Sequence, residues 1–163
     1  MKQYILTVIA FSITMLSHAQ IGSYPNMPTA DHTPMMNSTW EAIDKLMYQV
    51  TTKDNKKIYT PHYPPELKRL ENKTVELPGY LVPLTSGRNH KTFMLSVLPI
   101  TQCQFCGTNG IPPMVEIFMK KESVRYTEDP IKIKGKMKFN PEPLQGNAEI
   151  QIVDAELIPY KAD

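Results

Sequence analysis

A nine-residue segment near the C-terminus, IKIKGKMKF at 131–139, constrains the fold more than any other part of the chain. Apolar and lysine side chains alternate along it, which is the pattern of a β-strand with one buried face and one solvated face. We interpret the lysine row as a solvated face that keeps an edge strand from pairing with other chains. The apolar members are Ile131, Ile133, Met137 and Phe139, and the alternating lysines are Lys132, Lys134, Lys136 and Lys138.

Four further segments show strand-like patterns, and two of them contain irregularities. Pro78 and Gly79 interrupt the first segment and favour a bulge or a bend. In the last one the apolar alternation shifts phase after Ile152, which predicts a bulge of the kind that bends a strand around a small barrel. We therefore predict a mainly β protein, a small five-stranded OB-like barrel or curled sheet, with a β-sandwich as the second choice. The four segments are 74–86, 91–99, 114–120 and 148–158.

One amphipathic helix is expected before the strands, at 38–50. Its apolar residues recur at helical spacing and begin with Trp40, and Ser38 or Thr39 is in place to cap it. Residues 51–72 are polar and rich in proline, and they predict at most one helical turn, near Glu66–Leu70. The apolar stripe of the helix is Trp40, Ile43, Leu46 and Met47. Trp40 and Leu46 are expected to close one end or face of the core. The predicted core residues on the strands are Phe93, Leu95, Ile117, Ile133, Ile150 and Ile152.

The N-terminus has the features of an export signal. Lys2 precedes an uncharged run, Tyr4–Leu16, and Ser17 and Ala19 are small residues at the −3 and −1 positions of a cleavage site. That run is shorter than the roughly 20 residues that a bilayer core requires. We expect a periplasmic or secreted protein whose mature chain does not span the membrane. The predicted organisation is a signal peptide at 1–19, a flexible linker at 20–37, a helix and proline-rich lead-in at 38–73, and an OB-like β domain at 74–163.

Charge and motifs exclude several functions. The formal charge is only +2, which is too little to hold nucleic acid by neutralising its phosphates. No aromatic residues interleave with the lysine row to stack on bases. The chain also has no G-x-S-x-G, P-loop or H-E-x-x-H motif. His90, just before a predicted strand, is interpreted as a solvated loop residue.

The chain has two cysteines, Cys103 and Cys106, spaced C-x-x-C. This spacing is compatible with a disulfide, half of a metal site or a redox centre. Two thiolates do not complete a zinc site, which normally has four protein ligands, whereas copper(I) can be held by two soft ligands. Export into an oxidising compartment favours the disulfide. The candidate ligand loop consists of Cys103, Cys106, Gly107, Pro112 and Pro113.

Several segments between Leu70 and Leu157, about the last three-fifths of the chain, resemble a bacterial secreted family of unknown function, often encoded near ABC-type transporter genes. They are GYLVPL, FMLSVLPITQCQFCG, MVEI, IKIKGKMKFN and IVDAELI. Many members carry one cysteine followed by histidine and a run of prolines, whereas this chain has C-x-x-C-G and only Pro112-Pro113, like a Bacteroidetes-type subgroup. The resemblance implies an exported binding or accessory domain, with an ABC-type transporter or another envelope protein as partner.

Three functions remain in competition. The first is a non-enzymatic exported domain that engages a ligand, a metal ion or a transporter partner near the cysteine loop, because functional residues favour loops on a rigid scaffold. The second is a thiol–disulfide redox protein that uses Cys103 and Cys106. Such motifs usually begin a helix, whose dipole stabilises the thiolate, but here glycines and prolines precede a strand. The third is a structural protein in which a Cys103–Cys106 disulfide only fixes the shape of the loop.

Overall fold

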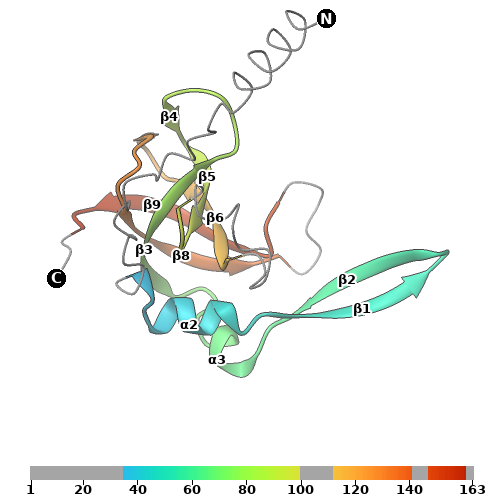
Figure 1. Ribbon diagram of the computed structural model, residues 1–163. Coiled ribbons are helices and arrows are strands. Elements are labelled where there is room, and N and C mark those ends of the chain that lie inside the picture. Colours follow the sequence, from blue (N-terminus) through green and yellow to red (C-terminus); the bar gives the residue numbers. More distant parts are fainter. Residues whose placement is uncertain (1–34, 100–111, 141–146, 161–163) are drawn as a thin grey trace, which may run out of the picture. The chain divides into compact units, whose positions relative to one another are not determined.

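A computed structural model of the chain describes residues 35–99, 112–140 and 147–160. Within these residues, five strands close into a barrel in the order β3-β5-β6-β9-β8 (Figure 1). Neighbouring strands are antiparallel except β6 and β9, which are parallel. This confirms the predicted mainly β, OB-like barrel. Its strands are β3 (Thr74–Pro83), β5 (Thr92–Ser96), β6 (Met114–Met119), β8 (Ile131–Phe139) and β9 (Ile150–Ile158).

The lysine row lies on the outside of the barrel, as predicted. Glu76 on β3 forms hydrogen-bonded ion pairs with Lys132 at 2.9 Å and with Lys134 at 3.3 Å. These hydrogen bonds lower the pKa of the Glu76 carboxyl. The edge-strand interpretation is wrong, however, because β8 pairs with β3 on one side and with β9 on the other. The lysines therefore form the solvated face of a strand that is paired on both sides in the barrel.

The predicted bulge in the last strand is present. Lys134 pairs with Glu156 and Lys136 pairs with Val153, so β9 has one extra residue between these pairs. Asp154 lies in this interval with a φ of 52°, the left-handed conformation that bulges often require. Opposite the bulge, Gly135 leaves room for β9, since an added Cβ would come within 2.6 Å of Cγ2 of Ile152.

Strand β3 changes partner at the Pro78–Gly79 position. It pairs with β8 as far as Gly79 and with β5 from Tyr80 onward. A Cβ at Gly79 would lie 2.7 Å from the carbonyl oxygen of Ser96, so the close approach of β5 requires glycine here. The predicted irregularity is thus the point where the strand passes from one neighbour to the next.

The barrel interior is filled by the predicted residues. All six predicted core side chains on the strands are at most 2% exposed. Trp40 is fully buried, and its indole Nε1 donates a hydrogen bond of 2.7 Å to the carbonyl oxygen of Pro78. Leu46 is partly buried against the same cluster. The helix therefore packs against β3, as expected for its apolar stripe.

The predicted helix is shorter than expected and is followed by a hairpin. Helix α2 covers Ser38–Asp44 and is capped by the Asn37 side chain, not by Ser38 or Thr39. Strand β1 (Met47–Lys53) then pairs with β2 (Lys56–His62) in seven residue pairs. The turn residues Asp54 and Asn55 have φ values of 50° and 60°, which is the type I′ geometry that suits a two-residue hairpin.

This hairpin, which we call the arm, is fastened to the barrel at its base. Pro61 is its only buried residue, and Figure 1 shows the ribbon extending beyond the barrel. Tyr63, the first residue after the arm, stacks on Phe139 with ring centroids 4.4 Å apart. Its hydroxyl lies 3.0 Å from the carbonyl oxygen of Asn140 and 3.1 Å from that of Glu149. These contacts fix the root of the arm beside the start of β9.

A short helix and a two-stranded sheet complete the described structure. Helix α3 (Pro65–Lys68) overlaps the turn predicted near Glu66–Leu70 and buries Leu67. Strands β4 (Asn89–His90) and β7 (Val124–Arg125) form a separate two-stranded sheet. Within the described residues, none of the helices is long and apolar enough to cross a membrane.

Candidate functional site

The predicted cysteine loop is only partly within the described structure. Cys103, Cys106 and Gly107 lie outside the described residues, so their pairing and metal binding stay predictions. Pro112 and Pro113, which end the loop, are described, and both line a groove of about 340 Å³. This volume is at the lower end of the range of small-ligand pockets, roughly 300–1,000 Å³. The groove is the candidate site that the structure supports.

Segments far apart in the sequence form the walls of the groove. Helix α2 and the residues after it supply aliphatic side chains, β5 and β6 supply two methionines, and the start of β9 closes the opposite side. Most of these side chains are apolar, as is usual for ligand sites. The lining residues are Ile43, Asp44, Leu46, Tyr48, Met94, Pro112, Pro113, Met114, Ala148, Glu149 and Ile150.

The polar groups of the groove are acidic or neutral. Asp44 and Glu149 are its two carboxylates, and no lysine, arginine or histidine is among its described lining residues. Burial, the negative charge of Glu149 and a hydrogen bond to that carboxylate raise the pKa of Tyr48 to about 12. The Tyr48 hydroxyl therefore stays protonated and donates to Glu149, which holds the carboxylate at the groove.

A buried carboxylate, Glu116, supports one side of the groove. It is 3% exposed, and the strand register places it between Met94 on β5 and Gln151 on β9. Its Oε2 accepts hydrogen bonds from the Ala148 backbone N–H at 3.1 Å and from Nε2 of Gln151 at 3.2 Å. These bonds satisfy a buried acidic oxygen and hold the segment at Ala148 against β6.

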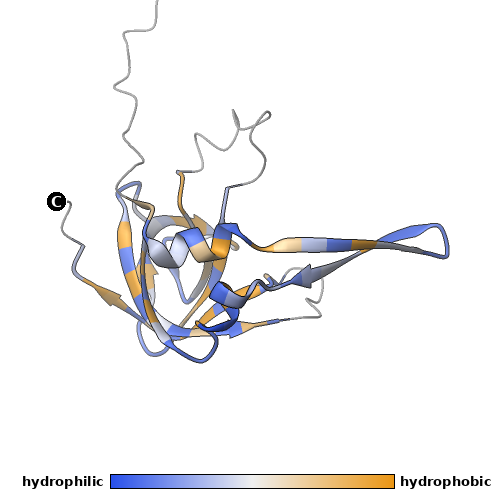
Figure 2. Ribbon diagram, turned by 90° about the horizontal axis from the view of Figure 1, so that it is seen from below, coloured by the Kyte–Doolittle hydropathy of each residue, from blue (hydrophilic) through white to orange (hydrophobic). Residues whose placement is uncertain are grey.

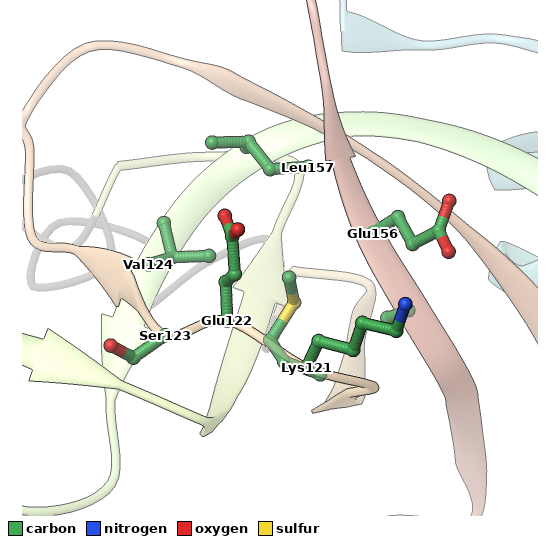
Figure 3. Close-up of a pocket in the computed structure, with 8 residues that line it drawn as sticks. Lys121, Glu122, Ser123, Val124, Glu156 and Leu157 are labelled. Atoms are coloured by element: carbon green, nitrogen blue, oxygen red, sulfur yellow. The ribbon is translucent and has the colours of Figure 1, made fainter.

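A second pocket, of about 280 Å³, lies between the end of β6, β7 and the end of β9. Figure 3 shows the Glu122 side chain extending between Val124 and Leu157. Lys121 and Glu156 also line it, so charges of both signs surround a small apolar area. Leu157 is itself 53% exposed. This pocket lacks the continuous apolar wall of the groove, and we do not assign it a binding role.

The interpretation of His90 as a solvated residue is wrong. Its side chain is 2% exposed, and it pairs with Val124 across the β4–β7 sheet. In the described part of the chain, neither ring nitrogen has a hydrogen-bond partner. A small satellite sheet thus buries a histidine that the sequence pattern places in a loop. An unpaired buried imidazole costs stability, because its nitrogens lose their hydrogen bonds to water.

The described residues contain no group of three or more histidine, cysteine, aspartate or glutamate side chains arranged to hold a metal ion. The predicted copper or zinc site depends on Cys103 and Cys106, which lie outside these residues. Comparison of the chain with protein-family models, with curated proteins and with solved structures gives no match. The family resemblance therefore stays a prediction.

The sequence predictions identified only one corner of this site. Pro112 and Pro113 were expected to matter because they end the cysteine loop. Met94, Tyr48 and Glu149 were missed, since each belongs to a different segment and only the closed barrel brings them together. A signal did exist for Tyr48: the Asp54-Asn55 turn sits between two β-prone segments, and recognising it would have placed Tyr48 on a hairpin.

Proposed function

We propose that the protein is an exported, non-enzymatic binding domain whose groove holds an apolar group that carries a positive charge. The observation that supports this most is the groove itself, which has apolar walls, two carboxylates and no basic side chain in its described lining. The same lining contains no serine, cysteine or histidine to act as a nucleophile or as the base of a nucleophile pair. The chemistry favoured by these residues is binding.

The position of the groove on the barrel supports a binding role. Met94 and Met114 belong to the second and third strands of the barrel in chain order. OB folds bind their ligands on the face of these strands and on the adjoining loops. The common binding face of OB folds is an analogy between folds. The groove is a feature of this structure in its own right, and it lies on that same face.

Each part of the groove has a separate role in binding. Burying an alkyl chain contributes about 0.8 kcal/mol per methylene, so the apolar wall provides most of the affinity. An exposed ion pair contributes about 0.2–1 kcal/mol, so Asp44 and Glu149 mainly select the sign of the ligand's charge. Complementary charges at a site give specificity more than affinity.

The biological setting of this proposal comes from the sequence. The N-terminal residues have the features of an export signal, which supports a periplasmic or secreted location, and the family resemblance supports an ABC-type transporter or another envelope protein as partner. An apolar side chain next to a lysine or arginine on such a partner has the chemistry that the groove favours. Cys103 and Cys106, immediately before the groove in sequence, are proposed to form a disulfide that fixes the loop. Copper binding and thiol–disulfide exchange are the alternatives.

Calorimetric titration with octylammonium and octanoate tests the groove, because these probes share an alkyl chain and differ in charge. We expect octylammonium to bind at least about threefold more tightly, the effect of two weak ion pairs. The double variant Asp44→Asn/Glu149→Gln should lose this preference. Met94→Lys should abolish binding, whereas Met36→Lys, at an exposed methionine outside the groove, should leave it intact. Equal binding of both probes would refute the proposal.

A further inference from the structure

One face of the arm exposes a row of large apolar side chains. Cross-strand partners share a face of a hairpin, and the register pairs Tyr48 with Pro61, Val50 with Tyr59, and Thr52 with Lys57. We call these six residues the arm face. Tyr48, Val50 and Tyr59 are 44%, 51% and 57% exposed, so the central part of this face is apolar and open to solvent.

The arm lacks the contacts that normally stabilise such a ribbon. A two-stranded hairpin is marginally stable by itself in water and needs a third strand or a packed face. Within the described residues, β1 and β2 form a sheet of their own, and neither pairs with a third strand. Grouped apolar side chains on a surface mark an interaction site. The arm face therefore has the character of a surface that a binding partner covers.

Charge is distributed unevenly along the arm. The tip carries Lys53, Lys56 and Lys57 against one acid, Asp54, and the register places Lys53 directly opposite Lys56. Figure 2 shows the hydrophilic character of the tip and the apolar stretches nearer the base. By the register Lys53 and Lys56 lie on the face opposite the arm face, and Lys57 is the lysine of the arm face itself. At the other end of the arm, the groove beside Tyr48 carries Asp44 and Glu149.

We propose that the arm pairs with the arm of a second copy of this chain, antiparallel and related by a two-fold axis. In this arrangement the Val50–Tyr59 rows of the two copies pack against each other at the axis. The Lys57 of each copy then approaches the Glu149 of the other, where Tyr48 holds that carboxylate. A seven-residue strand spans about 23 Å, enough to carry the tip of one arm to the base of its partner.

The surface is self-complementary in the way that a two-fold interface requires. Such an interface uses the same patch on both copies, so each contact occurs twice. The arm face and the groove beside it meet this condition together, because the Val50–Tyr59 pair lies at the middle, Lys57 lies toward the tip, and Glu149 of the groove lies beside Tyr48 at the base. A hairpin that inserts into a membrane would need the reverse order, with apolar residues at its tip. The order of residues therefore favours a second copy over a lipid surface.

This inference goes beyond the proposed function and shares with it only Tyr48 and Glu149. The methionine wall of the groove takes no part in the arm pairing. The two ideas are separable by experiment, because Lys57 belongs to the arm and is not among the groove-lining residues.

Sedimentation velocity of the purified protein over a concentration series tests the pairing by exchanging charges. The native chain should show a monomer–dimer equilibrium, and Lys57→Glu and Glu149→Lys should each weaken it by about tenfold. An equimolar mixture of these two variants should regain the native dimer affinity, since the mixed dimer has two ion pairs, one native and one with reversed sign. Lys136→Glu, the same charge change on an exposed barrel position, should leave the equilibrium unchanged.

Three outcomes would overturn the inference: a native chain that stays monomeric, variants that associate as the native chain does, or a mixture that fails to recover. A monomeric chain whose Lys57→Glu variant loses binding to phosphatidylglycerol vesicles would assign the arm to a membrane surface instead. Octylammonium binding by the Lys57→Glu variant keeps the two proposals apart. If it persists while the dimer is lost, groove and arm act independently. If octylammonium fails to bind this monomeric variant, in which no partner lysine competes for Glu149, the groove proposal fails and the arm pairing is judged by the dimer equilibrium alone.

Discussion

Truncation of Ile133 to alanine tests the register of the barrel. Its side chain is 1% exposed, and its partners in the ladder are Leu77 on β3 and Leu157 on β9. The substitution removes three carbon atoms, which at about 0.8 kcal/mol each amounts to a transfer free energy of roughly 2.4 kcal/mol. The cavity left in a closed barrel adds to this, so we expect a loss of about 3–4 kcal/mol, within the usual range of about 2–5 kcal/mol for such truncations.

Urea denaturation followed by the fluorescence of Trp40, the single tryptophan, measures this loss. With an m-value of about 1.5–2 kcal/mol/M for a domain of this size, the midpoint should fall by about 2 M. Lys136→Ala on the outer face of the same strand is the control, and its effect should stay within about 0.5 kcal/mol. If the two substitutions cost the same, Ile133 does not face the core and the assigned register is wrong.

Three further predictions concern groups outside the barrel core. His90→Leu should raise the free energy of unfolding by about 1 kcal/mol, because it removes a buried imidazole that has no hydrogen-bond partner among the described residues; a clear loss of stability in urea would show that the ring has a partner. Burial and the nearby charge of Glu149 raise the pKa of Tyr63 to about 12, so the folded state holds this proton more tightly than the unfolded state does. The Tyr63 contribution to stability should be constant below pH 10 and be lost between pH 10 and 12. Tyr63→Phe should make the fall in stability over this range less steep, with Tyr48, whose pKa is also raised to about 12, supplying the remainder; an equally steep fall would exclude Tyr63 as a cause. Thiol titration of the unfolded, non-reduced protein should find no free thiol at Cys103 and Cys106, whereas two free thiols with stoichiometric copper or zinc would indicate a metal site.

The barrel was predictable because burial imposes a period of two on its strands. The row from Ile131 to Phe139 alternates between the core and the solvent along its whole length, and its predicted bounds match β8. The phase shift after Ile152 likewise marked a real bulge, since the extra residue moves the following side chains to the other face. These features are local consequences of a closed barrel and so appear directly in the sequence.

The arm was missed for the opposite reason. Both of its faces are exposed, so no alternation between buried and solvated residues distinguishes its strands. The helical spacing of Trp40 and Ile43 continued by chance to Leu46 and Met47, and the predicted helix therefore ran into β1. Met47 is in fact 57% exposed.

The groove was only partly predictable, because no single segment contains it. The two prolines after the cysteine loop marked its position, while Tyr48, Met94 and Glu149 converge only after the barrel has closed. The burial of His90 is also a tertiary effect, produced when β7 pairs with β4. Sequence periodicity reports on strands and helices one at a time, and it carries no information about such convergence.

Methionine methyl NMR during a titration with octylammonium tests the binding groove most directly. Met94 and Met114 line the groove, and Met137 is fully buried in the barrel core, so the chain contains its own control. We predict that the methyl signals of Met94 and Met114 shift and saturate together with the calorimetric isotherm, while that of Met137 stays in place. Saturable binding with the Met94 and Met114 signals unmoved would contradict the proposed site.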